Sequence, residues 1–191
     1  MCRFDFLVFL SGEGILLATL VVLVQQRGFH VLGFAYEGTA GMVVAVMVGR
    51  PSLAALMLGR TFDRLTIRTI VVLPVLLILA GEGFAVLAFA PNLWATFLGV
   101  VLVGGLYNGI SDPMPALLGD VTRPQFYGKS VGIYQLFGDV GGSLGPIVGL
   151  ESGLHFGMLP TYLAAGALLI VSTPVALRIF GRERKWRRME S

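Results

Sequence analysis

The sequence contains few charged residues and a single cysteine. Only 13% of its 191 residues are charged, whereas soluble domains carry about 25%. The single cysteine, Cys2, excludes an internal disulfide and any metal site built from several cysteines. The sequence also lacks a glycine-rich phosphate loop followed by lysine, and its histidines, His30 and His155, stand alone. These shortages argue against a soluble protein, against an enzyme and against a bound cofactor or metal.

Long apolar segments recur along the sequence. Hydrophobic residues make up 55% of the chain, and its mean hydropathy is +0.83. About 20 apolar residues suffice for a helix to cross a hydrocarbon core of ~30 Å. The sequence therefore predicts an all-α membrane protein whose residues 1–181 form one domain of six transmembrane helices. The expected spans are residues 6–24, 33–58, 69–89, 94–117, 130–150 and 158–180.

Lysine and arginine are distributed unequally between the loops. With six spans, the two chain ends, the connector 59–68 and the loop 119–129 share one face, and Arg27 is the basic residue of the opposite face. Because basic residues favour the cytoplasmic side, we expect both termini to be cytoplasmic and the membrane to be the plasma (inner) membrane. We interpret residues 182–191 as a basic cytoplasmic tail that anchors this orientation rather than as a nucleic-acid-binding segment.

The connector between the second and third spans carries the first motif. Its residues Gly59, Asp63, Arg64 and Arg68 follow the pattern Gly-x3-Asp-Arg-x3-Arg. This pattern resembles the loop between the second and third helices of each half of a major facilitator superfamily transporter. The resemblance implies that these four residues form a gating loop, which holds the cytoplasmic helix ends together and releases them during transport. An ordinary positively charged loop is the alternative interpretation.

The fifth span carries the second motif. Gly132, Gly141, Gly145, Pro146 and Gly149 follow the order Gly-x8-Gly-x3-Gly-Pro-x2-Gly, which resembles a signature of proton-linked exporters in the same superfamily. The last three glycines, at four-residue spacing, fall on one helix face and allow another helix to approach. In the resembled family this helix lies at the seam between the two halves. Generic packing of small residues is the alternative interpretation.

Four ionisable residues from four different spans lie at a similar depth. With a rise of ~1.5 Å per residue, each lies roughly 9–13 Å from the cytoplasmic end of its span. They are Glu13, Arg50, Asp112 and Asp139. Because a charge within a span costs at least ~2.5–3.5 kcal/mol, we expect a charge layer in which Arg50 pairs with Asp139 or Asp112. Alternatively, Arg50 and Asp112 extend singly to the interface.

Glu13 and Glu82 each stand between two glycines, which leaves room for a helix or a substrate to approach. In the resembled fold the first and fourth helices of a half line the central cavity, and the third lies outside. The resemblance therefore implies that Glu13 is the favoured proton or substrate site and Glu82 the weaker one. Further residues expected along the substrate and proton pathway are Tyr107, Asn108, Asp112, Gln135 and Asp139, although helix–helix hydrogen bonds would have the same pattern.

The resemblance covers most of the chain and implies one six-helix half, built as a 3+3 inverted repeat, of a twelve-helix bundle. The half resembles the carboxy-terminal half of a drug or sugar exporter. The implied function is secondary active transport, namely proton-coupled efflux of a small organic solute by alternating access, as in an antiporter. Because one half provides only one wall of the cavity, we expect a second half or a homodimer partner. The alternative is a non-transporting membrane module or accessory subunit that packs against a partner half.

Overall fold

The computed structural model of the chain describes residues 2–28, 38–39, 41–45, 69–111 and 114–190. Within these ranges the chain forms helices and no strand. This agrees with the expected all-α class. The expectations for Arg50, Asp112 and the connector 59–68 concern residues outside the described ranges.

The first helical segment is continuous but changes its geometry in the middle. It consists of α1 (Cys2–Phe9), the π-helical turn η1 (Leu10–Ile15) and α2 (Leu16–Gln26). The π turn contains the Gly12-Glu13-Gly14 sequence, where the low helix propensity of glycine makes the regular α-helical pattern easier to interrupt.

In the described part of the chain, one helix is both long enough and apolar enough to cross a membrane. This helix is Asp5–Gln26. Shorter apolar helices follow at Pro74–Phe89, Leu93–Gly105 and Met158–Pro174. The expected number of six spans therefore stays a prediction.

The middle of the chain forms a helical hairpin and a short third helix. The hairpin consists of α4 (Thr69–Phe89), with the bounds expected from the sequence, and α5 (Leu93–Ser111). The Asn92 side chain accepts a hydrogen bond from the backbone N–H of Ala95 at 2.9 Å and so caps the start of α5. The expected fourth span, 94–117, corresponds to α5 together with part of α6 (Met114–Val121).

Two long helices complete the fold. The short 3₁₀ turn η2 (Pro124–Phe126) leads into α7 (Tyr127–Phe156), which is followed by α8 (Met158–Glu190). The expected end of the fifth span at residue 150 is wrong, because α7 continues to Phe156 and ends at Gly157, whose φ is 90°. Glu151 and His155 form an i,i+4 pair at 3.3 Å that supports this last turn. The basic tail is likewise helical, since α8 continues to Glu190.

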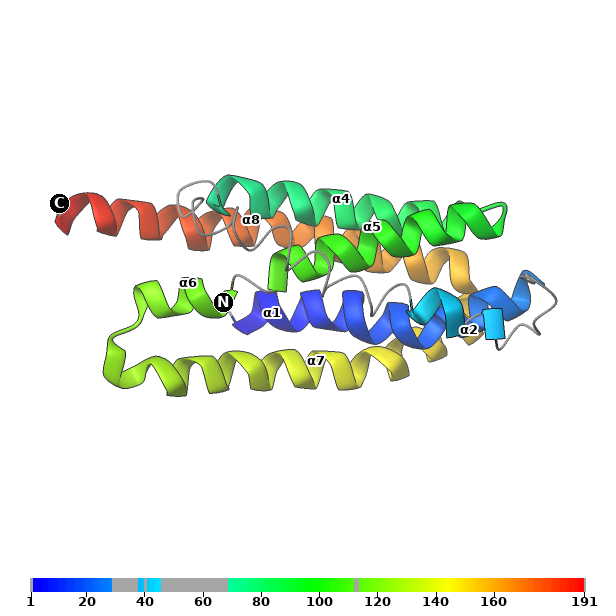
Figure 1. Cartoon of the computed structure of the whole chain (residues 1–191), viewed down its shortest axis with the longest axis horizontal. Coiled ribbons are helices and arrows are strands. Elements are labelled where there is room, and N and C mark those ends of the chain that lie inside the picture. The colour runs from blue at the N-terminus through cyan, green and yellow to red at the C-terminus, as the bar shows by residue number, and fades with distance from the viewer. Residues whose placement is uncertain (1, 29–37, 40, 46–68, 112–113, 191) are drawn as a thin grey trace.

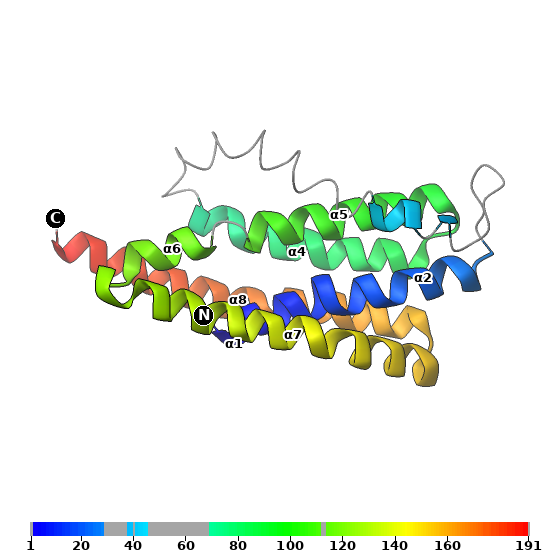
Figure 2. The same ribbon diagram turned by 60° about the horizontal axis from the view of Figure 1, so that its bottom comes forward.

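The helices lie side by side in an up-and-down bundle. The first segment, α4 and α7 run in one direction, and α5 and α8 run in the other (Figure 1). α4 packs against α5 and α8, whereas α7 packs along α1, η1 and α2. α4 and α7 therefore lie on opposite sides of the first segment (Figure 1 and Figure 2). α1 begins and α8 ends at the same end of the bundle (Figure 1).

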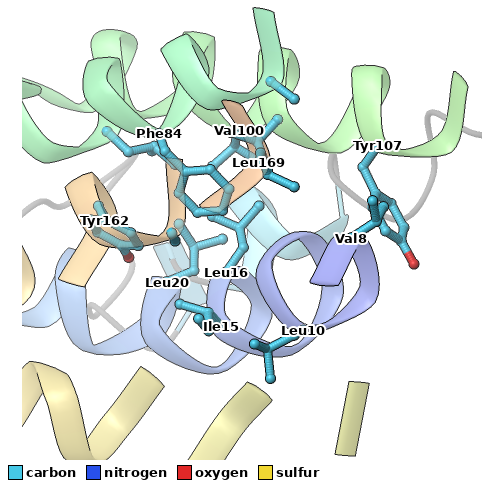
Figure 3. Close-up of a cluster of buried hydrophobic side chains, with 14 of the residues drawn as sticks. Val8, Leu10, Ile15, Leu16, Leu20, Phe84, Val100, Tyr107, Tyr162 and Leu169 are labelled. Atoms are coloured by element: carbon cyan, nitrogen blue, oxygen red, sulfur yellow. The ribbon is translucent and has the colours of Figure 1, made fainter. Parts of the chain in front are cut away.

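The apolar core joins the first segment to α4, α5 and α8 (Figure 3). Leu16 and Leu20 of α2 are fully buried, as is Phe84 of α4. The Phe84 ring lies 6.0 Å from the ring of Tyr162 of α8, measured between centroids. A hydrogen bond of 3.0 Å joins the hydroxyl groups of Thr19 and Tyr162, so both polar groups are satisfied within the core.

Candidate functional site

The candidate site lies where α5 crosses the π turn. The Tyr107 hydroxyl donates a hydrogen bond to Oε2 of Glu13 at 3.1 Å, joining residues 94 positions apart. The Tyr107 side chain reaches from α5 toward the first segment, beside Val8 (Figure 3). Its ring also meets the Phe9 ring edge to face, with centroids 5.4 Å apart. Tyr107 is only 8% exposed, whereas Glu13 is exposed, so a buried hydroxyl holds an accessible carboxyl group in place.

The two glycines beside Glu13 allow this arrangement. A Cβ atom on Gly12 would collide with the Tyr107 ring, and a Cβ atom on Gly14 would lie 2.5 Å from Cα of Gly145 on α7. Side chains at either position would therefore push α5 or α7 away from the π turn. This is the close approach that the sequence predicted for glycines on both sides of Glu13.

The π turn places Glu13 between two other helices. Tyr107 of α5 lies on one side, and on the other a Cβ atom on Gly142 of α7 would be 3.9 Å from Oε2 of Glu13. Single π turns within α-helices occur frequently at functional sites, because the additional residue turns a side chain away from the regular packing face. The π turn, the acid and the tyrosine together distinguish this position from an ordinary packing contact.

The glycine motif of α7 provides the surface against which the first segment packs. A Cβ atom on Gly141 would lie 2.5 Å from the carbonyl oxygen of Phe6, and one on Gly149 would lie 3.2 Å from Cα of Ile15. Gly132, the first glycine of the motif, has no neighbour within 4 Å of its Cβ position in the described structure. Half-buried Pro146 follows Gly145 within α7. The glycine face is thus occupied by the same chain, and the role of this motif at a seam between halves stays a prediction.

The other expected pathway residues lie on α5 and α7. Gln135 and Asp139 are exposed, and Nε2 of Gln135 donates to Oδ1 of Asp139 at 3.1 Å along α7. Asn108 follows Tyr107 on α5. Of the expected pathway residues, the structure brings Glu13 into direct contact with Tyr107. It also brings Gln135 into contact with Asp139. The proposed Arg50–Asp139 pair is not tested, because Arg50 lies outside the described residues.

A buried acid, Asp5, was missed by the sequence analysis. It is only 2% exposed, has Tyr134 as a hydrogen-bonding neighbour and lies close enough to Asp139 for their charges to interact. Its Oδ2 atom accepts no hydrogen bond within the described structure and faces the backbone of Gly138. The expected first span began at Phe6, so Asp5 was counted with the chain end. An acid directly before a long apolar run was the available signal.

Arg27 and Lys129, two of the described basic residues, lie near helix ends. Arg27 follows α2 and donates hydrogen bonds to the carbonyl oxygens of Leu87, Ala88 and Ala90 where α4 ends. Lys129 lies in the first turn of α7. As far as the described residues go, no group of three or more His, Cys, Asp or Glu side chains is arranged to hold a metal ion.

An apolar pocket opens between α1 and α7. Its volume is about 490 Å³. The lining residues are Phe6, Leu7, Leu136, Phe137 and Val140. The pocket therefore offers only hydrophobic contacts.

Comparison with known proteins assigns the family. The model of the Major Facilitator Superfamily matches residues 6–190. No curated protein and no solved structure matches the chain. Members of this superfamily are integral membrane transporters of small molecules and not enzymes. Because the match extends over nearly the whole chain, from the first helical segment to the end of α8, the chain belongs to the Major Facilitator Superfamily.

Proposed function

We propose that this chain is one six-helix half of a secondary transporter, which exports a small organic solute in exchange for protons. The proposal rests on one observation. Exposed Glu13, which lies on the π turn, accepts a hydrogen bond from buried Tyr107 of α5. Glu13 lies eight residues beyond Asp5 in the apolar helix Asp5–Gln26, or about 12 Å along its axis. A carboxyl group at that depth belongs to the class of intramembrane ionisable residues that mark ion pathways.

Protonation is the chemistry that fits this site. A charged side chain within a membrane helix costs at least ~2.5–3.5 kcal/mol, and a bound proton removes the charge. Within the described structure Glu13 forms no ion pair, and the basic residues Arg27 and Lys129 lie near helix ends. Glu13 then alternates between a protonated state and an ionised state, and the Tyr107 hydroxyl stabilises the ionised state by donating to it. A cationic or polar group of the solute competes with the proton for the same carboxylate.

The direction in which the helices run supports an orientation with both termini in the cytoplasm. The start of α1 and the end of α8 lie at the same end of the bundle (Figure 1). Lys129 and the arginines of residues 182–188 belong to that end, whereas Arg27 belongs to the other. Under the positive-inside rule the end with more basic residues faces the cytoplasm. The proposal includes six spans, arranged as two inverted repeats of three helices.

A second half completes the proposed transporter. α7 exposes large apolar side chains on the surface that is not covered by the first segment, and they continue the lining of the apolar pocket. They include Leu136, Phe137, Val140, Leu144 and Ile147. In a transporter with alternating access the two halves enclose a site near the bilayer midplane. We propose that another six-helix half, or a second copy of this chain, covers this side of α7.

Everted membrane vesicles provide the test. With an inward-acid pH gradient, vesicles containing the chain and its partner half are expected to accumulate an organic cation such as ethidium. Glu13→Gln is expected to abolish the pH-driven accumulation, whereas Glu151→Gln, which changes an exposed acid at the end of α7, should leave it intact. If the chain is inserted and folded but the vesicles accumulate no cation with any partner half, the result would support the alternative of a non-transporting membrane module.

A further inference from the structure

We propose that the outer face of α4 is an interface for a second copy of this chain, with the two Glu82 carboxyl groups hydrogen-bonded to each other. This interface is separate from α7 and from the Glu13 site. It rests on the proposed membrane span of α4 and on the surface of that helix, and does not depend on proton coupling.

Glu82 points away from the bundle because both neighbouring residues face inward. A Cβ atom on Gly81 would lie 2.6 Å from Cγ1 of Ile170 on α8, and a Cβ atom on Gly83 would lie 2.9 Å from Cγ2 of Val103 on α5. These two contacts fix the rotation of α4 about its own axis. Successive side chains of a helix are separated by about 100°, so Glu82 cannot turn into the core without breaking both contacts.

The surroundings of Glu82 on this surface are apolar. The exposed large hydrophobic residues of α4 are Val75, Ile78, Leu79 and Phe89. Together with Glu82 they occupy positions i, i+3, i+4, i+7 and i+14, which form a single stripe along the helix. A stripe of this spacing is the kind of surface that packs against another helix. Among these five described residues, Glu82 alone is ionisable.

The depth of Glu82 makes an isolated carboxyl group unfavourable there. It lies seven residues before the end of α4 at Phe89, or about 10 Å along the helix axis. Lysine and arginine can extend to the interface from such a depth, but the glutamate side chain is too short to do so. Intramembrane acids usually face the interior of a bundle or a water-filled cavity, and in the described structure Glu82 makes no hydrogen bond or ion pair.

A second copy of the chain brings a second Glu82, which can serve as the missing hydrogen-bonding partner of the first. In a dimer whose two-fold axis is perpendicular to the membrane, each residue lies at the same depth as its symmetry mate. The two Glu82 side chains then meet within the apolar stripe, and a protonated carboxyl group donates an O–H···O hydrogen bond to the other. Lipid chains provide no such partner, and a single polar residue on an apolar stripe is known to select helix pairing and register.

Cysteine crosslinking in membranes tests this interface. In a Cys2→Ser background, which removes the only native cysteine, Ile78→Cys places a thiol one turn from Glu82. Val171→Cys on α8, which is 70% exposed and belongs neither to the stripe on α4 nor to the surface of α7, is the control for random collision. We expect oxidation to yield a disulfide-linked dimer through residue 78. The dimer should become scarce when Glu82→Leu is added.

The strength of the effect follows from measured polar contacts between membrane helices. Glu82→Leu, which removes the contact between the two Glu82 side chains, is expected to weaken dimerisation about 3- to 20-fold. Energy transfer between labelled copies, recorded as lipid is added, measures this change. Glu82→Gln keeps the hydrogen-bonding groups and should retain the dimer, whereas Glu82→Lys should abolish it by charge repulsion. Circular dichroism and monomeric elution in detergent show that each variant is folded.

Two results would overturn the proposal. One is equal crosslinking through residues 78 and 171 that does not depend on Glu82. The other is a dimer whose dissociation constant is the same for the unsubstituted chain, for Glu82→Leu and for Glu82→Lys. Neither result bears on transport, so failure of this interface is distinguishable from failure of the proposed function.

Discussion

Replacing Gly145 by alanine tests the close approach between α7 and the first helical segment. The new Cβ atom would collide with the backbone of Gly14 and lie 2.7 Å from the carbonyl oxygen of Leu10. Both neighbours are backbone groups, so the strain cannot be relieved by a rotamer change. Overpacking of this kind costs about 1–3 kcal/mol, and the better helix propensity of alanine returns about 1 kcal/mol. At the upper end of that range, the net destabilisation is about 2 kcal/mol.

Gly132→Ala is the matched control on the same helix. Its Cβ position has no neighbour within 4 Å in the described structure, so only the gain in helix propensity of about 1 kcal/mol applies. The two variants should therefore differ by the overpacking cost, about 1–3 kcal/mol, or about 2–12 °C in Tm for a chain of this size. Thermal unfolding in detergent, followed by circular dichroism, measures the difference. Equal Tm values for the two variants would refute the packing of α7 described here.

Three further substitutions test other contacts in the same unfolding assay. Tyr107→Phe removes the hydrogen bond to Glu13, and it should lower the free energy of unfolding by about 1 kcal/mol and also lower proton-coupled transport. The control Tyr162→Phe should lower stability but not transport. Equal transport by the two variants would argue against the site. Arg27→Ala removes the hydrogen bonds to the last carbonyl groups of α4 and should cost about 1–3 kcal/mol; an unchanged Tm would show that this contact is not formed in the membrane protein. Gly157→Ala imposes a side chain at φ 90° and should cost about 1–3 kcal/mol, and a rise in Tm would contradict the turn between α7 and α8.

The sequence was a good guide where local signals determine the structure. The bounds of α4 agree with the expected span, because the break before α5 is encoded by Pro91 and by Asn92, which caps α5. The end of the fifth span, expected at residue 150, was misplaced. Glycine and polar residues suggested an early end of the helix, but the Glu151–His155 pair supports one more turn and only Gly157, among the described residues of this stretch, adopts a positive φ.

The site depends on contacts that local sequence does not encode. The π turn at Glu13 is held by Tyr107, 94 residues away, and by the backbone of Gly145 on α7. The two glycines beside Glu13 indicated room for another helix, but not which helix or which side chain would enter. Asp5 was overlooked because its burial results from packing against α7 around Tyr134 and Gly138, which hydropathy alone does not reveal.

Proton movement in proteoliposomes tests the central claim most directly. The purified chain and its partner half are reconstituted with a pH-sensitive dye inside the vesicles, and an organic cation is added outside. The account predicts that uptake of the cation drives protons outward, that the interior becomes more alkaline, and that Glu13→Gln abolishes both movements. Uptake of the cation with no change in internal pH, or an unchanged proton flux in the Glu13→Gln variant, would contradict it.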